Sequence, residues 1–306
     1  MSSSTVSIGR RSASWSARLV DYIELSKPRI VFLVLLAVAT SALVARWGQP
    51  DTWQVFHAML GTLLVAASAG ALNQLYEWRP DAVMARTANR PVPAGRLSSQ
   101  EVAVFAVVCG VVGLGYLALA VNWIAAAWGF ASWLIYVCVY TPLKPRSCAN
   151  TTVGAVAGAL PVFIGWSAVG GTLDVVADPR SLAMSLILFL WQFPHFVAIT
   201  WLYRQQYARA GLQMLTVVDP SGCQAALQAV TTCLALLPVS LTAALLTSGQ
   251  GRWWYLSVTF VLGAVQLACA VQFLRRRSDR TARRLLRATL LYLPALLICL
   301  VLASMD

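Results

Sequence analysis

The sequence has few charged side chains, and acidic ones are the scarcest. Asp, Glu, Lys and Arg make up 11% of the 306 residues, and only 11 residues are acidic, whereas an ordinary soluble domain is about 25% charged. Hydrophobic residues reach 59% of the chain. This composition excludes an ordinary soluble domain and is typical of a protein that lies mostly within a membrane.

The sequence also lacks a disulfide framework, a cysteine pattern for metal binding and a secretory signal. The seven Cys form no CxxC pair, so we interpret them as small buried apolar residues. The first residues are rich in Ser and Arg but lack an apolar core, which excludes a secretory signal and leaves a transit peptide as the alternative to a plain tail. We expect residues 1–20 to form a disordered basic tail and residues 21–306 to form one membrane domain.

Long uncharged runs predict nine membrane-spanning helices. About 20 apolar residues cross the hydrocarbon core as a helix, and the uncharged run at 102–143 is long enough for two helices, with a turn at Asn122 and Trp123. We therefore predict an all-α, polytopic membrane protein. The nine helices are expected near residues 30–47, 55–76, 101–121, 124–142, 150–169, 181–202, 223–247, 253–274 and 287–304.

The Lys and Arg residues predict how the chain is oriented in the membrane. With a cytoplasmic N-terminus, the tail and the connections on its side carry 20 of the 23 Lys and Arg residues. The opposite side keeps only Arg46, Arg180 and Arg252. Because basic residues accumulate on cytoplasmic loops, we predict a cytoplasmic N-terminus. This distribution explains the net charge of +12 without a nucleic-acid partner.

The most informative polar stretch follows the second predicted helix and reads ALNQLYEWRPDAVMARTANRP. Asn73, Glu77 and Asp81 recur every four residues, so they share one face if the helix continues through them. Their oxygens suit Mg²⁺, and Arg86 and Arg90 beside them suit phosphate oxygens. The stretch predicts a metal-bridged diphosphate site, with an ordinary basic loop carrying scattered acids as the alternative.

Two further segments add polar side chains near the membrane. Lys144 lies in YTPLKPRSCANTTVG, where its ammonium either neutralises a leaving diphosphate or serves only as a topological charge. His195 lies in WQFPHF, inside an uncharged run of the sixth predicted helix. A histidine in such a place is either a hydrogen-bonded packing residue or a ligand and proton carrier.

The segment WLYRQQYARAGLQML follows the same helix and resembles half of an active site without its carboxylate. Arg204, Gln206 and Tyr207 are placed where the helix meets water, and the first acid after them is Asp219. We expect these three residues to form a second wall of the diphosphate site. An amide oxygen such as that of Gln206 still coordinates a hard cation, but without the negative charge.

Together with ELSKPRI at residues 24–30, these segments resemble, in order and spacing, the protohaem IX farnesyltransferases of the UbiA superfamily of intramembrane prenyltransferases. The resemblance extends from about residue 21 to the end of the chain. It implies nine helices around a central cavity, with metal and diphosphate bound at the cytoplasmic mouth. It also implies the bacterial inner membrane, rather than the mitochondrial one, as the location.

The resemblance implies transfer of a farnesyl group from farnesyl diphosphate to a vinyl group of haem B, which gives haem O. Its product would serve terminal oxidases, directly or through haem A synthase, which makes such assembly proteins possible partners. Carried over by position, the resemblance implies three groups of site residues. Asn73, Glu77 and Asp81 would bind Mg²⁺. Arg86, Arg90 and Lys144 would bind the diphosphate, with Lys144 also acting in catalysis, and His195 would face the haem.

The chain departs from the family pattern at three acidic positions. Family members read Asn-x3-Asp-Arg-Asp-x-Asp in the first motif, where this chain has Glu77 and Arg79, and an acid stands where this chain has Gln206. Arg79 would point about 160° away from the Asn73 face on a continuous helix. Three alternatives therefore remain: a degenerate member that binds haem or prenyl lipid as a carrier, a quinone-type prenyltransferase, and a transporter, for which the sequence offers little.

Overall fold

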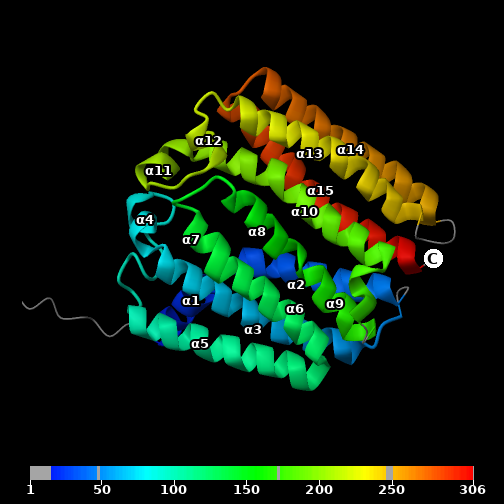
Figure 1. Cartoon of the computed structure of the whole chain (residues 1–306), viewed down its shortest axis with the longest axis horizontal. Helices are drawn as coiled ribbons and strands as arrows, with labels where there is room; N and C mark the ends of the chain where they lie inside the picture. Colours follow the sequence, from blue (N-terminus) through cyan, green and yellow to red (C-terminus); the bar gives the residue numbers. More distant parts are fainter. Residues whose placement is uncertain (1–14, 47–48, 171–172, 246–250, 306) are drawn as a thin grey trace, which may run out of the picture.

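The computed structural model describes residues 15–46, 49–170, 173–245 and 251–305, and all regular elements within these ranges are helical (Figure 1). Two of them, η1 and η2, are π-helical, and η3 is a 3₁₀ helix. The elements are α1 (Trp15–Leu25), α2 (Pro28–Ala45), α3 (Thr52–Tyr76), α4 (Trp78–Val83), α5 (Ser99–Tyr116), η1 (Leu117–Val121), α6 (Trp123–Leu134), η2 (Ile135–Tyr140), α7 (Thr141–Leu143), α8 (Asn150–Ala159), α9 (Pro161–Gly170), η3 (Leu173–Val176), α10 (Pro179–Leu202), α11 (Arg204–Arg209), α12 (Leu215–Val218), α13 (Cys223–Leu245), α14 (Gly251–Arg275) and α15 (Asp279–Met305).

Nine spans within the described residues are long and apolar enough to cross a membrane, which confirms the predicted all-α, nine-helix class. Three spans combine consecutive elements: α5 with η1, α6 with η2 and α7, and α8 with α9. The predicted turn in the long uncharged run is also confirmed. Asn122 lies between two spans, and its side chain accepts a hydrogen bond from the backbone N–H of Ala125 at 2.8 Å, which caps the start of α6.

The last helix begins earlier than the sequence predicts. Hydropathy places its start near residue 287, but α15 begins at Asp279 and includes four Arg residues. Hydropathy marks only the part of a helix inside hydrocarbon, whereas an amphipathic first turn extends into the aqueous interface. Asp279 in that first turn favours the helix because its charge complements the N-terminal end of the helix dipole.

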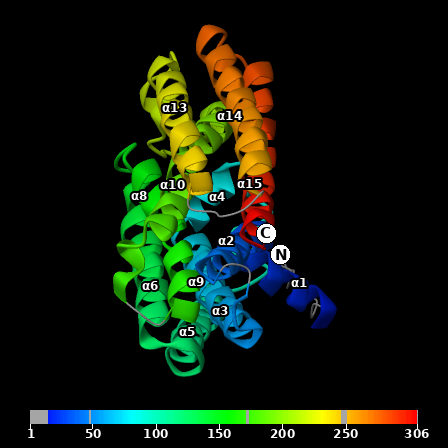
Figure 2. The same ribbon diagram turned by 90° about the vertical axis from the view of Figure 1, so that its right-hand side faces the viewer.

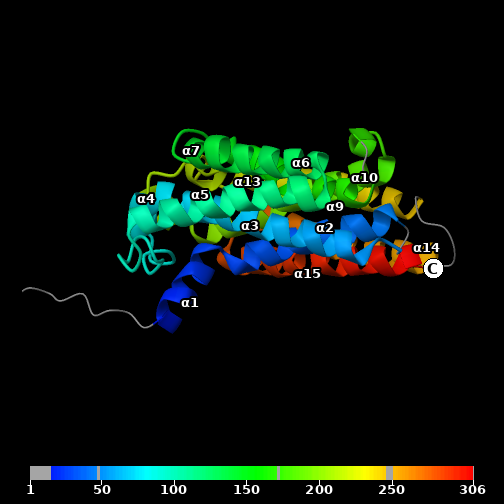
Figure 3. The ribbon, with the colours of Figure 1, turned by 90° about the horizontal axis from the view of Figure 1, so that it is seen from below.

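Part of the predicted tail is also helical. Residues 1–14 lie outside the described residues. Residues 15–20, which the sequence predicts to be disordered, belong to α1 instead. Contacts distant in sequence fix this helix: Arg18 pairs with Glu101, Asp21 pairs with Arg96, and the Tyr22 ring packs against α5. Figure 3 shows α1 leaning away from the bundle at the end where α4 lies.

The spans form a ring of two groups. One group contains α2, α3, α5, α6 and α9, and the other contains α10, α13, α14 and α15; the groups meet where α15 contacts α2 and α8 contacts α10. Figure 2 shows α13 and α14 on one flank and α3 and α5 on the other. Exposed apolar side chains cover the outward faces, as on α5 with Val104, Val107 and Val111. This surface suits lipid.

The ends of the bundle differ in their polar content. Figure 1 shows α4, α7 and α11 together at one end, while the C-terminus lies at the other. The connections that carry most of the Lys and Arg residues lie at the α4 end. A cytoplasmic α4 end remains the prediction that follows from this distribution.

Glycines allow the helices of the ring to approach one another closely. At Gly165 in α9, an added Cβ would overlap the backbone oxygen of Val38 and the Ser41 Oγ, both in α2. Membrane helices lack a strong hydrophobic drive to associate, so close backbone packing at small residues contributes much of their association. The contact between α2 and α9 therefore depends on the missing side chain of Gly165.

We expect Gly165→Ala to lower the unfolding temperature of the purified protein, because a methyl group has no space beside a backbone carbonyl. Overpacking of this kind costs about 1–3 kcal/mol. Gly115→Ala is the matched control, since no atom lies within 4 Å of an added Cβ at Gly115. Equal unfolding temperatures for both variants would contradict the proposed close packing.

Candidate active site

A cavity of about 400 Å³ lies at the centre of the ring, which confirms the expected central cavity. Its size falls in the range of small-molecule sites. Apolar side chains of the spans line its interior, including Ile164, Leu188 and Leu293. Polar side chains gather at its mouth near α4. At this mouth α3 and η2 end and the segment after α7 begins. The cavity thus joins a charged mouth to an apolar interior.

The junction of α3 and α4 brings three oxygen-bearing side chains into this mouth. The helix assignment changes at Glu77, but its N–H donates to the Asn73 backbone oxygen at 3.0 Å, and the Asp81 N–H donates to the Glu77 backbone oxygen at 2.8 Å. Helical spacing therefore continues through the break, and Asn73, Glu77 and Asp81 all line the cavity. Pro80 lies in the first turn of α4, where proline is tolerated.

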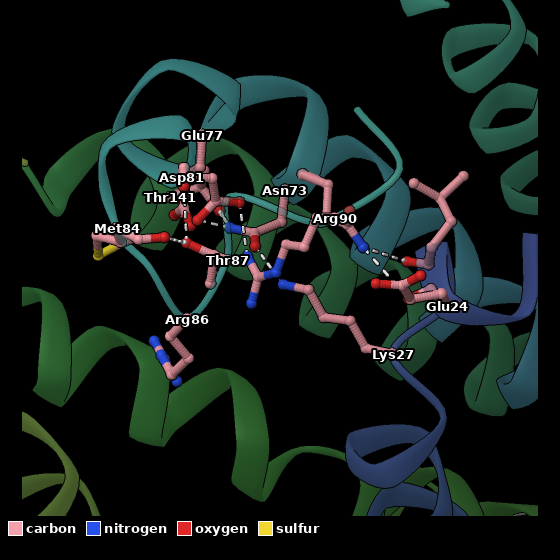
Figure 4. A network of polar contacts seen from close by, with 12 residues as sticks. Glu24, Lys27, Asn73, Glu77, Asp81, Met84, Arg86, Thr87, Arg90 and Thr141 are labelled. Atoms are coloured by element: carbon pink, nitrogen blue, oxygen red, sulfur yellow. Dashed lines mark hydrogen bonds and ion pairs between the residues drawn. The ribbon is translucent and has the colours of Figure 1, made fainter. Parts of the chain in front are cut away.

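Each of these three side chains contacts a basic side chain, and Figure 4 shows Lys27 beside Asn73 and Arg90 near Asp81. Asp81 Oδ2 lies 2.6 Å from Arg90 Nη1, and Lys27 Nζ donates to the Asn73 side-chain oxygen. The Lys144 Nζ lies 2.6 Å from Glu77 Oε1. Opposite charges at these distances stabilise one another strongly when they are shielded from water.

Burial and charge together set the protonation of the buried mouth residues. Burial alone would raise the pKa of Glu77, but the attraction of Lys144 and Lys27 outweighs it and holds the pKa below its usual value. Burial disfavours the Lys144 ammonium, yet Glu77 and two neighbouring tyrosines raise its pKa above the usual value. Burial lowers the pKa of Lys27 to about 7 despite the attraction of Glu77, and repulsion by Lys144 contributes.

The mouth fits a hard cation. Asp81 is buried, and its Oδ1 atom has no hydrogen-bond partner among the described residues. Asn73 holds Glu77 in place, donating to Glu77 Oε1 at 2.9 Å and to the Thr141 hydroxyl at 3.0 Å. Within the same residues there is no group of three His, Cys, Asp or Glu side chains that would bind a metal alone. Two carboxylates and one amide suit a magnesium ion that shares its remaining ligands with a substrate.

The segment after α10 forms the facing wall of the mouth. Tyr207 lines the cavity, and its hydroxyl accepts a hydrogen bond from Arg86 Nη2 at 3.0 Å. The Gln206 side-chain oxygen accepts from the Arg86 backbone N–H at 3.4 Å. Further along, the Gln213 N–H donates to the Lys144 backbone oxygen at 2.7 Å. This wall therefore positions Arg86 and the Lys144 segment.

Three polar side chains of that region, those of Gln206, Arg204 and Asp219, are not among the residues that line the cavity. Arg204 Nη1 donates to the Trp201 backbone oxygen at 2.6 Å and to Asp279 at 3.0 Å. Asp219 accepts hydrogen bonds from Ser221 and from the Gln224 N–H, which fixes the start of α13. The second wall thus supplies no carboxylate to the mouth from the described residues.

Arg79 lies outside the mouth, as the helical spacing predicts. Its side chain is exposed, and its guanidinium lies 5.2 Å from the centre of the Trp78 ring. Because Arg79 points away from the cavity, its positive charge is shielded by water rather than added to the buried cluster.

His195 lies on the cavity wall between the mouth and the far end of α10. Its ring stacks on Trp191 with ring centres 4.8 Å apart, and its Nδ1 lies 3.0 Å from the Thr289 hydroxyl. That hydroxyl donates its single hydrogen to the Leu286 backbone oxygen at 2.8 Å. Nδ1 must then be the donor, which leaves the Nε2 lone pair available as a ligand.

Lys27 is the functional candidate that sequence reasoning missed. It lines the cavity although it precedes α2, and it contacts a residue 46 positions away. A signal was present in the composition: Lys27 and Lys144 are the only two lysines in the chain, and Pro-Arg follows each of them. Every other Lys or Arg position in the chain is an arginine, so the two Lys-Pro-Arg segments differ from the rest of the basic sequence.

Comparison with known proteins agrees with this architecture. Residues 33–298 match the model of the UbiA prenyltransferase family. The protoheme IX farnesyltransferase of Rhodopirellula baltica is 44% identical over 290 residues, covering 92% of this chain and 99% of that protein. The corresponding protein of Solibacter usitatus is 41% identical over 284 residues, covering 90% of this chain and 95% of that protein.

Solved structures agree at the level of the fold. A digeranylgeranylglyceryl phosphate synthase superposes with a TM-score of 0.75 at 15% identity, covering 94% of this chain and 99% of that chain. A UbiA homologue from Archaeoglobus fulgidus bound to GPP and Mg²⁺ superposes with a TM-score of 0.66 at 16% identity, covering 93% and 99%. The chain therefore belongs to the UbiA prenyltransferase family and, within it, to the protohaem IX farnesyltransferases.

Proposed function

We propose that the protein transfers a farnesyl group from farnesyl diphosphate to a vinyl group of haem B and so produces haem O. The observation that carries this proposal is the joining of a basic, carboxylate-bearing mouth to an apolar cavity with His195 on its wall. A prenyl diphosphate has a charged head and an apolar chain, and the cavity has the same two parts. The names of relatives up to 44% identical support this choice of substrates.

The mouth residues divide into two roles. Asn73, Glu77 and Asp81 would hold Mg²⁺, which supplies charge stabilisation to the departing diphosphate. The diphosphate oxygens would be bound by basic side chains and by the facing wall, with Gln206 acting through its contact with the Arg86 backbone. The proposed diphosphate set is Arg86, Arg90, Lys144, Gln206 and Tyr207. Arg204, which the sequence also suggested, is left out because Asp279 and Trp201 engage it.

The reaction requires a charged end and a dry end. The bond between farnesyl C1 and the diphosphate oxygen breaks, and its electron pair leaves with the diphosphate, where Lys144 and the arginines neutralise it. The allylic cation is protected by apolar walls until the haem vinyl group donates its electron pair to C1. Water then adds to the resulting cation next to the porphyrin and releases a proton, which gives the hydroxyethylfarnesyl group.

His195 is the proposed contact with the haem. Its Nδ1 is engaged by Thr289, and the remaining lone pair on Nε2 suits iron ligation. Hydrogen bonding to the second ring nitrogen is the usual way in which proteins orient an imidazole ligand. Ligation at this point would hold the porphyrin in the apolar part of the cavity, below the diphosphate.

The multi-pass structure places the protein in a membrane, and we propose the bacterial inner membrane as its location rather than the mitochondrial one. There the product would pass to terminal oxidases, directly or after conversion by haem A synthase. Because the second wall lacks a carboxylate, a second candidate function remains. It is that of a carrier that binds haem or prenyl lipid without turnover.

Purified protein supplied with farnesyl diphosphate, haem B and Mg²⁺ is expected to yield haem O, detected by mass spectrometry. Asp81→Asn should lower the rate by roughly 100-fold or more while haem binding is retained, because the metal loses a charged ligand. Asp279→Asn removes a carboxylate outside the cavity and serves as control. Absence of product from the wild type would support the carrier instead, whereas an unaffected Asp81→Asn rate would contradict the proposed role of Asp81 in holding the metal.

His195→Ala is expected to weaken haem B binding on the order of tenfold, since it removes the iron ligand. The measurement is an absorption titration of the haem Soret band. Binding of a non-reactive farnesyl diphosphate analogue should be unchanged. His57→Ala is the matched control, because His57 contacts Tyr116 and does not line the cavity. Identical titrations for the two histidine variants would rule out His195 as the ligand.

Gln206→Glu is expected to lower the Mg²⁺ concentration needed for half-maximal activity by about fivefold. The isosteric carboxylate adds one negative charge beside the mouth, and such a charge contributes about 1 kcal/mol across a partly hydrated contact. Gln205→Glu is the control, because Gln205 is exposed. A magnesium dependence that is the same in both variants would show that the second wall does not act on the metal.

A further inference from the structure

All three proposed metal ligands are already occupied by basic side chains of the protein. Lys27 holds the Asn73 oxygen, while Arg90 and Lys144 pair with the two carboxylates. We call Lys27, Arg90 and Lys144 the counter-ion set. Their contacts use one oxygen of each ligand, namely Asn73 Oδ1, Asp81 Oδ2 and Glu77 Oε1, and a metal ion would need these oxygens as well. Metal and counter-ions therefore compete for one group of oxygens.

Lys27 is positioned by an unusual backbone conformation. Lys27 has φ of 55°, a left-handed conformation that is uncommon for residues other than glycine. The junction around it is held against α3, because Gln74 donates to the Leu25 backbone oxygen at 3.1 Å and Gly70 leaves room for the approach. A conformation of this kind persists only where the surrounding structure enforces it, and such places cluster at functional sites.

Lysine suits this role better than arginine. Its ammonium is a compact point charge that one carboxylate or phosphate oxygen satisfies, and its stem is flexible. The Lys144 ammonium lies 4.4 Å from the centre of the Tyr140 ring, so a neighbouring π face stabilises it in addition to the Glu77 carboxylate. Both lysines of the chain can thus exchange one oxygen partner for another without leaving the mouth.

The mouth carries an excess of positive charge. Among the described residues, four Lys and Arg side chains line the cavity, namely the counter-ion set and Arg86, together with the two carboxylates of Glu77 and Asp81. A free divalent cation entering this buried cluster would displace a counter-ion and add to the excess. A diphosphate, which carries several negative charges, would be attracted by the same excess and would offer new oxygens to the displaced cations.

We propose that the counter-ion set excludes free Mg²⁺ from the mouth and that diphosphate admits the metal by drawing these cations onto its own oxygens. The metal and the diphosphate then bind with positive coupling, whose size is set by the counter-ion set. This inference rests on the proposed function only in that the bound anion is a diphosphate. Lys27 is a positioning residue in this proposal, because its ammonium contacts the Asn73 oxygen rather than the reacting atoms.

Metal binding to the full chain in nanodiscs of neutral lipid tests the inference. Equilibrium dialysis against Mn²⁺, with empty nanodiscs as reference, measures bound metal with and without the thiolodiphosphate analogue of farnesyl diphosphate. The wild type is expected to bind Mn²⁺ at least about tenfold more tightly with the analogue, which corresponds to about 1.4 kcal/mol of coupling. Equal Mn²⁺ affinity with and without the analogue would overturn the inference.

Lys27→Met separates this role from a structural one. Removing the counter-ion should raise the affinity for Mn²⁺ alone about tenfold and lower the affinity for the analogue alone by a similar factor. A damaged site would lose both affinities, so a fall in both would also overturn the inference. Arg18→Met is the control, because it removes a cation that pairs with Glu101 outside the cavity. Neither affinity should change in that variant.

Arg90→Met provides a second variant in case Lys27→Met does not fold, and the same opposite changes are expected from it. The readout requires no haem and no turnover, so it separates this inference from the proposed function. Coupled binding without haem O formation would leave the inference standing and remove the transferase. Haem O formation by a protein that binds Mn²⁺ alone as tightly as with the analogue would do the reverse.

Discussion

The pairing of buried charges at the mouth is the interaction on which the rest of the site depends. A carboxylate removed from water destabilises a fold strongly unless a partner compensates it. Glu77 and Asp81 are both buried, and Lys144 and Arg90 compensate them. These pairs join the α3–α4 junction to the segment after α7 and to the loop after α4. The same contacts therefore stabilise the mouth and keep basic side chains where the proposed diphosphate would bind.

The features that follow local rules were predictable from the sequence. Hydropathy identified the nine spans because the length of a helix that crosses hydrocarbon is fixed by the bilayer. The spacing of four residues placed Asn73, Glu77 and Asp81 on one side because helical hydrogen bonding continues through the Glu77 break. Arg79 was predicted to point away for the same reason, and it is exposed. In each case neighbours along the chain determine the outcome.

The features that the sequence did not predict depend on contacts between distant segments. Lys27 enters the mouth only because the α1–α2 junction packs against α3, and the signal that remained, two lysines each followed by Pro-Arg, has no meaning without the fold. Arg204 was expected at the diphosphate, but Asp279, 75 residues later, engages it. The early start of α15 supplies that carboxylate. Hydropathy could not reveal this start because the first turns of α15 lie outside the apolar part of the helix.

The absence of a carboxylate from the second wall affects the net charge of the whole mouth. A second acidic segment would bring the mouth closer to neutrality and would let metal ions bind before substrate. Here Gln206 uses its oxygen on the Arg86 backbone, and Asp219 fixes the start of α13, so the mouth stays positive. A positive mouth attracts the anionic head of a prenyl diphosphate into a cavity whose interior is apolar. Under the proposed function, the second wall would contribute by positioning basic groups, and the metal would bind together with the diphosphate.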